Sequence, residues 1–147
     1  MRRWVALPSM REAKEGFNPC EWRDSVYLCG YRSLAIEVLS LQTDQFLHIQ
    51  LSIPESESCC LYVHNSLLVV HTFQHIYKFA GPQGGHLLLH SQTETRTGTN
   101  KCPNSRPVVD CGRGVFFYYQ WDKCLCVDME SGELVQRFPY GSTSWEI

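Results

Sequence analysis

GVFFYYQWDKCLCVDMESGELVQRF, residues 114–138, contains three short apolar runs that are separated by the polar segments QWDK and ESG. The runs VFFYY, CLCVDM and ELVQRF, at 115–119, 124–129 and 133–138, have the length of β-strands, and the glycine of ESG suits a tight turn. A fourth run, PVVDC at 107–111, precedes them across the turn GRG. The stretch therefore predicts a four-stranded antiparallel meander.

The same order of strands and turns occurs twice more upstream, at residues 19–51 and 59–92. The second strands of the three units begin at Val26, Leu67 and Val115, with spacings of 41 and 48 residues. The polar insert TETRTGTNKCPNS between the second and third units explains the longer spacing. A repeat of roughly 40 to 50 residues with four strands is typical of a β-propeller blade.

The second strands of the three units, VYLCG, LLVVH and VFFYY, are almost continuously apolar. A half-exposed sheet shows strict alternation, whereas a strand between neighbouring blades is buried on both faces. We therefore predict an all-β fold in which antiparallel four-stranded meanders repeat as the blades of a partial β-propeller. An irregular β-sandwich whose meanders look alike by chance is the structural alternative.

The repeats divide the chain into an N-terminal segment, residues 1–16, and three blade-like units. A short helix is expected over PSMREAKEG in the segment, where Ser9 and Glu12 fit a capping box. The units are expected at 17–57, at 58–104 with the polar insert, and at 105–147. Because propellers have roughly four to eight blades, three units predict a segment of a larger propeller or self-association through open blade edges.

With the repeats aligned, the chain resembles kelch-type β-propellers. SVYLCGY and AIEVLSLQTDQF, within residues 25–46, follow the kelch order of apolar strand, glycine, short loop, apolar strand and polar turn. Gly30 stands in place of the kelch double glycine, and Phe46 in place of the usual tryptophan. VDMESGEL, at 127–134, fits a turn also seen in quinoprotein-type propellers. The kelch resemblance implies a scaffold or a substrate-recruiting adaptor, and the quinoprotein turn implies part of a propeller enzyme as the alternative.

The formal net charge of −2 and the pI of about 6.3 give no electrostatic reason to expect a nucleic acid or an anionic membrane as partner. The apolar run WVAL near the N-terminus is far shorter than a signal-peptide core or a membrane helix. We therefore expect a soluble, cytoplasmic protein whose partner is another protein.

The residue types of catalytic and metal sites occur without the spacing of such sites. Cys124 and Cys126 share a strand face and lie downstream of Cys102 and Cys111, but buried thiols fit these apolar runs better than a zinc site. No nucleophile elbow or phosphate loop is present. Turn carboxylates such as Asp128 favour local hydrogen bonds. The sequence thus predicts no catalytic residue, no metal and no cofactor.

The histidines are expected to be isolated surface or loop residues rather than a converging site, and they are His64, His71, His75, His86 and His90. Recognition in propellers is expected in loops at the ends of a rigid, strand-built disc. The loops between second and third strands place aromatic and arginine side chains at their tips, types enriched at binding hot spots. The candidate partner-binding residues are Tyr31, Arg32, Phe73, His75, Trp121 and Asp122. The alternative is that Tyr31, Phe73 and Trp121 pack between blades.

Overall fold

Three four-stranded sheets make up the chain in the computed structural model. The structure describes residues 3–11, 18–29, 35–51, 53, 60–72, 74–83, 85–96, 109–110, 112, 114–119 and 123–139. Within these ranges there are twelve strands and no helix. Residues 3–11 have no regular secondary structure, and residues 12–16 of the predicted helix lie outside the described ranges.

Each sheet is an antiparallel meander in which every strand pairs with the next one along the chain. The first sheet consists of β1 (Asn18–Trp22), β2 (Ser25–Cys29), β3 (Ala35–Ser40) and β4 (Phe46–Gln50). The second sheet consists of β5 (Cys60–His64), β6 (Leu67–His71), β7 (His75–Gln83) and β8 (His86–Glu94). The third sheet consists of β9 (Val109–Asp110), β10 (Gly114–Tyr119), β11 (Lys123–Asp128) and β12 (Leu134–Pro139).

Two-residue turns connect the first and second strands of the first two sheets. Arg23 and Asp24 lie between β1 and β2, and Asn65 and Ser66 lie between β5 and β6. All four residues have positive φ angles, from 48° to 63°. Positive φ at both central positions is the feature of type I′ turns, whose twist matches that of the flanking strands.

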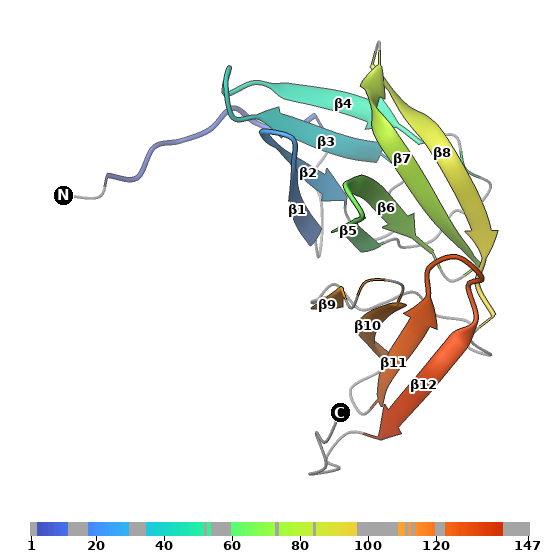
Figure 1. Cartoon of the computed structure of the whole chain (residues 1–147). Helices are drawn as coiled ribbons and strands as arrows, with labels where there is room; N and C mark the ends of the chain where they lie inside the picture. Colours follow the sequence, from blue (N-terminus) through green and yellow to red (C-terminus); the bar gives the residue numbers. More distant parts are fainter. Residues whose placement is uncertain are drawn as a thin grey trace.

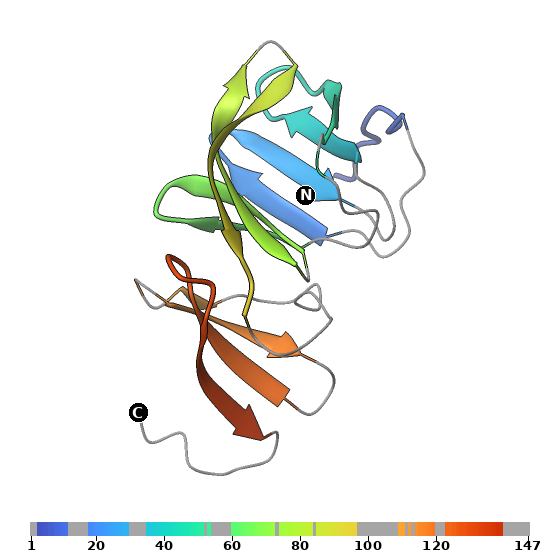
Figure 2. The same ribbon diagram turned by 90° about the vertical axis from the view of Figure 1, so that its right-hand side faces the viewer.

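The three sheets follow one another along an arc (Figures 1 and 2). The first strands β1, β5 and β9 lie on the inner side of the arc, and the fourth strands β4, β8 and β12 lie on the outer side (Figure 1). Strand β1 contacts β5, and β4 contacts β8. This is the arrangement of propeller blades, so the predicted fold class is confirmed.

Two apolar clusters join the sheets. The first lies between the first and second sheets and includes Trp22, Tyr27, Cys29, Ile36, Val38, Ile49, Leu51, Leu61, Leu68, Val70, Tyr77 and Phe79. The second lies between the second and third sheets and includes Cys60, Tyr62, Val69, Ile76, Leu125, Val127 and Met129.

Strand β6 shows why the second strands are apolar on both faces. Leu68 and Val70 belong to the first cluster, and Val69 between them belongs to the second cluster. Each of these three side chains is fully buried. Because successive strand residues point to opposite faces, β6 fills two cores at once, as its continuous apolar run predicted.

Among the residues that the structure describes, none forms a helix long and apolar enough to cross a membrane.

Candidate functional site

The predicted contact loops fall mostly outside the described residues. Tyr31, Arg32, Phe73, Trp121 and Asp122 all lie there. His75 is described, and it is the first residue of β7 rather than a loop tip. Its half-buried ring lies 5.5 Å from the ring of Tyr77, with an interplanar angle of 42°. The partner-binding role of these six residues therefore stays a prediction.

Thr72 organises the connection between β6 and β7. Its hydroxyl oxygen accepts hydrogen bonds from the backbone N–H groups of Gln74 and His75, at 3.2 and 2.9 Å. The backbone N–H of Thr72 donates to the carbonyl of His75 at 2.9 Å, and the carbonyl of Gln74 accepts from Thr95 at 2.8 Å. A buried threonine that bonds the backbone of its own turn in this way holds the connection in one conformation.

A cleft opens between the outer strands of the first and second sheets. Its volume is about 210 Å³. The residues that line it are Gln50, Leu51, Ile53, Tyr77, Phe79, His86, Leu87, Leu89 and Gln92. Leu51, Tyr77 and Phe79 are buried core residues, whereas Gln50, His86 and Gln92 are exposed. None of the nine is an aspartate, glutamate, lysine or arginine, so the cleft offers an apolar floor with a neutral polar rim.

Bulges in the β7–β8 pair determine which leucines face the cleft. The pairing register shifts on both sides of Phe79, which pairs with Leu89, while Gly81 pairs with Leu88. Leu87 and Leu89 line the cleft, and Leu88 does not. Leu88 and Leu89 are nonetheless similarly exposed, at 54% and 49%. The sequence analysis did not identify this site. The sign of it in the sequence is HLLLH, residues 86–90, an unusually apolar run for an outer strand.

Two histidines that we expected at the surface are buried. His64 and His71 are 1% and 2% exposed. The prediction of isolated surface or loop histidines is wrong for this pair, because both lie in strands packed between two other sheets. His86 and His90 on β8 are exposed.

His71 belongs to a buried polar cluster that connects the second and third sheets. The Tyr62 hydroxyl lies 2.8 Å from Nδ1 of His71 and 3.5 Å from the sulfur of Met129. Complete burial lowers the pKa of His71 from its ordinary 6.5 to about 3. A neutral imidazole enclosed in a core is suited to holding two sheets together, and it has no access to a substrate in solvent.

This burial predicts a loss of stability in mild acid. The unfolded chain protonates His71 near pH 6.5, whereas the folded chain resists protonation until about pH 3. Stability therefore falls as the pH drops from 6.5 towards 3, by on the order of 2 kcal/mol between pH 7 and pH 5. Urea unfolding at both pH values measures this loss.

Asparagine at position 71 keeps a polar group near Tyr62 but does not titrate. We expect H71N to unfold at lower urea concentration than the parent at pH 7 and to lose about 2 kcal/mol less than the parent on going to pH 5. His90 is exposed, so H90N should keep the parent's dependence on pH. An H71N chain with the same pH dependence as the parent would contradict the assignment.

The turn between β11 and β12 is fixed by its own polar groups. The Asp128 carboxylate accepts hydrogen bonds from the backbone N–H groups of Glu130 and Ser131, both at 2.9 Å. These are the local bonds expected for a turn carboxylate. The turn also reaches the second sheet. Arg96, two residues beyond β8, donates from its backbone N–H to the carbonyl of Gly132 at 2.7 Å, and Nζ of Lys78 on β7 lies 3.3 Å from the Glu130 carboxylate. The turn that resembles quinoprotein propellers thus connects two sheets.

Most of the cysteines that were considered as zinc ligands lie outside the described residues. This applies to Cys102 and Cys111 and to the side chain of Cys124. Cys29, Cys60 and Cys126 are buried among apolar residues, as expected for thiols in apolar strands. Within the described part of the chain, no three His, Cys, Asp or Glu side chains are placed to hold a metal ion.

No protein-family model matches the chain, and no curated protein matches its sequence. A solved structure, that of glutaminyl cyclase from Myxococcus xanthus, is similar to it with a TM-score of 0.58 and 13% sequence identity. The match covers 82% of this chain and 50% of the cyclase chain, so this chain spans half the length of that protein. A likeness at this identity shows the fold alone. This chain therefore shares an all-β, propeller-like architecture with that structure.

Proposed function

We propose that the chain is a non-catalytic protein-interaction module and that the cleft between the first and second sheets is its docking site. The composition of the cleft is the observation that supports this most directly. Its floor is apolar, its rim is formed by two glutamines and a histidine, and its lining has no fixed charge. Such a site favours an uncharged apolar side chain of a partner, which fills the cleft while the backbone meets the polar rim.

The size of the cleft favours a protein anchor over a metabolite. Pockets for small molecules typically have about 300 to 1,000 Å³. The cleft, at about 210 Å³, is smaller and has room for about one large side chain. The outer strands β4 and β8 contact each other here and end their sheets, so an extended partner segment can approach along a strand edge.

The resemblance to kelch propellers supports the proposal that this module is a scaffold or a substrate-recruiting adaptor, which we place in the cytoplasm. The loops with Tyr31, Phe73 and Trp121 are the alternative contact surface of the same proposal. A structural segment of a larger propeller, without a ligand of its own, is the alternative function.

Peptide selection tests the cleft. Random peptides displayed on phage are selected on the full chain, and enriched peptides are titrated against two variants. Leu89→Glu places a carboxylate in the cleft and is expected to weaken binding at least tenfold. Leu88→Glu is the matched control, because Leu88 is similarly exposed but lies outside the lining.

A third variant decides between the cleft and the loops. Peptides that bind the Leu89→Glu chain as well as the parent, but lose affinity for Trp121→Ala, would favour the loops as the contact surface. If selection enriches no peptide, the alternative of a structural segment is favoured. Thermal melting of both glutamate variants confirms that each remains folded.

The absence of catalysis is also part of the proposal. The solved structure with the similar fold is a glutaminyl cyclase, so the informative assay is cyclisation of a peptide with an N-terminal glutamine. We expect no turnover above the uncatalysed rate. Among the described histidines, His71 is the one with a strongly lowered pKa, and it is sealed in the core, away from any substrate in solvent. Measurable turnover would replace the binding proposal with the enzyme alternative.

A further inference from the structure

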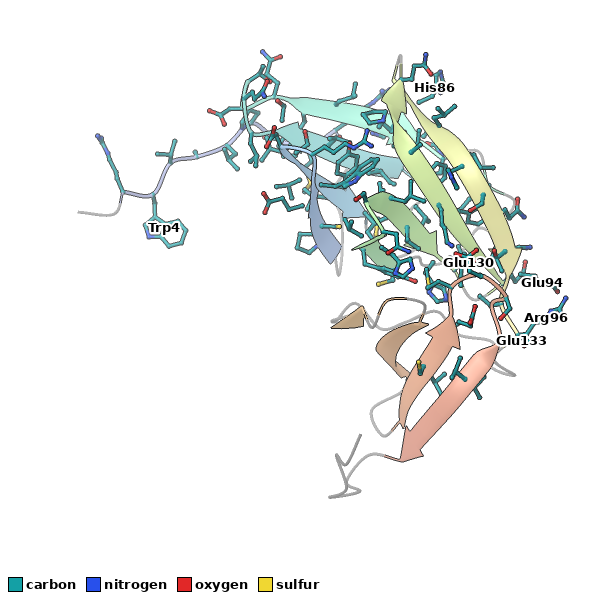
Figure 3. The ribbon with its side chains drawn as sticks, in the orientation of Figure 1. Trp4, His86, Glu94, Arg96, Glu130 and Glu133 are labelled. Atoms are coloured by element: carbon teal, nitrogen blue, oxygen red, sulfur yellow. The ribbon has the colours of Figure 1, made fainter. Side chains whose placement is uncertain are left out.

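The segment at residues 3–11 displays apolar side chains to solvent. Trp4 is 99% exposed, Val5 is 75% exposed and Leu7 is 54% exposed. The segment has no regular secondary structure, and Figure 3 shows Trp4 far from the side chains of the three sheets. A tryptophan gains a large amount of free energy when its surface is removed from water. Docking of these side chains on another surface would therefore be favourable.

The segment and the cleft are chemically complementary. The cleft accepts an uncharged, apolar side chain on an extended backbone, and it has room for one large residue. Trp4 is such a residue, and it lies in a segment free of helix and strand. The indole N–H also needs a hydrogen-bond acceptor when it is buried, and the exposed rim residues Gln50 and Gln92 provide side-chain carbonyl groups for it.

The segment leads away from the cleft of its own chain. Figure 1 shows it extending away from the three sheets, on the side opposite to β7 and β8. A second copy of the chain meets no such restriction. We propose that Trp4 of one copy docks in the cleft between the first and second sheets of a second copy. This inference rests on the proposed function of the cleft as a docking site.

The contact joins two different surfaces, so the association is head-to-tail rather than two-fold symmetric. A single tryptophan buries about 150 to 250 Å², far less than the roughly 1,000 Å² of a stable interface. The association is therefore weak, rapidly reversible and dependent on concentration. Because partner and second copy occupy the same cleft, a bound partner should dissociate the copies.

Sedimentation of mixed variants tests the proposal with the full chain. The parent should sediment faster as its concentration rises, whereas Trp4→Ser and Leu89→Glu should each reduce self-association at least tenfold. An equimolar mixture of these two variants should associate again, because one supplies an intact cleft and the other an intact Trp4. The mixture should stop at dimers, since each pair has only one working contact. Ser9→Ala and Leu88→Glu are the matched controls and should behave as the parent.

A synthetic peptide of residues 3–11 provides a direct measurement. It should bind the parent and Leu88→Glu, bind Leu89→Glu at least tenfold more weakly, and lose binding when its tryptophan is replaced by serine. The inference is overturned if Trp4→Ser sediments as the parent does, if the mixture stays monomeric, or if the peptide does not bind. If the inference is overturned but peptides selected by phage display bind Leu89→Glu more weakly than the parent, the cleft is a docking site and Trp4 of a second copy is not its ligand.

Discussion

Replacing Trp22 by alanine is expected to lower the free energy of unfolding by about 3 to 5 kcal/mol. Trp22 is 5% exposed at the end of β1, and its ring lies 5.4 Å from the ring of Tyr27 in the first cluster. Its indole N–H donates to the carbonyl of Ser66 in the β5–β6 turn at 3.1 Å. The substitution therefore leaves a cavity and also removes a bond between the first and second sheets.

Arg23→Ala is the control for this experiment. The Arg23 guanidinium lies 4.7 Å from the centre of the Trp22 ring but is exposed to solvent. Loss of an exposed cation–π contact costs about 0.5 to 1 kcal/mol. Urea unfolding measures the free energy of unfolding of both variants. Relative to the parent, W22A should accelerate hydrogen exchange more in the first sheet than in the third. A W22A chain within 1 kcal/mol of the parent would show that the first sheet does not depend on this contact.

The second large effect is expected at Gly132, where alanine should cost about 3 kcal/mol or more. Gly132 has a φ of +72°, which a residue with a Cβ adopts only at a cost of about 1 to 2 kcal/mol. A Cβ at this position would also overlap the backbone carbonyl of Glu94 at the end of β8. Because backbone cannot move aside as a side chain can, the β11–β12 turn would have to separate from the second sheet.

Gly85→Ala separates the two parts of this cost. Gly85 has a similar φ of +81°, but a Cβ there would meet no atom within 4 Å. We expect it to lose only about 1 to 2 kcal/mol. The excess loss in Gly132→Ala then measures the contact with Glu94, and hydrogen exchange should show the third sheet opening first. Equal losses in the two variants would mean that the contact contributes nothing.

The strands were predictable because each one follows from a short, local pattern. VFFYY and LLVVH are apolar on both faces, which only a strand between two sheets requires, and the Leu68–Val69–Val70 run fills both cores as expected. The segment ESG also predicted that Gly132 lies in a tight turn. Its contact with Glu94 was not predictable, because 38 residues separate the two positions and the distance depends on how the second and third sheets pack.

The candidate site was less predictable. Reasoning from loop position selected residues such as Trp121, which lie outside the described part of the chain, and it missed the cleft. The cleft combines Gln50 from the first unit with Leu89 from the second, and its shape depends on bulges beside Phe79. The prediction that His71 lies at the surface was wrong for a related reason, because the residue pattern of β6 does not show whether a neighbouring sheet covers this side chain.

The sequence alone determined that this chain is built from three four-stranded antiparallel units, because strand length, turn chemistry and two-sided apolarity are local properties of a segment. Only the tertiary structure decided which surfaces face each other. The burial of His71, the contact between Gly132 and Glu94, and the cleft beside Leu89 all arise between sheets. Their cause is the packing of segments that are distant in sequence, and no local pattern encodes it.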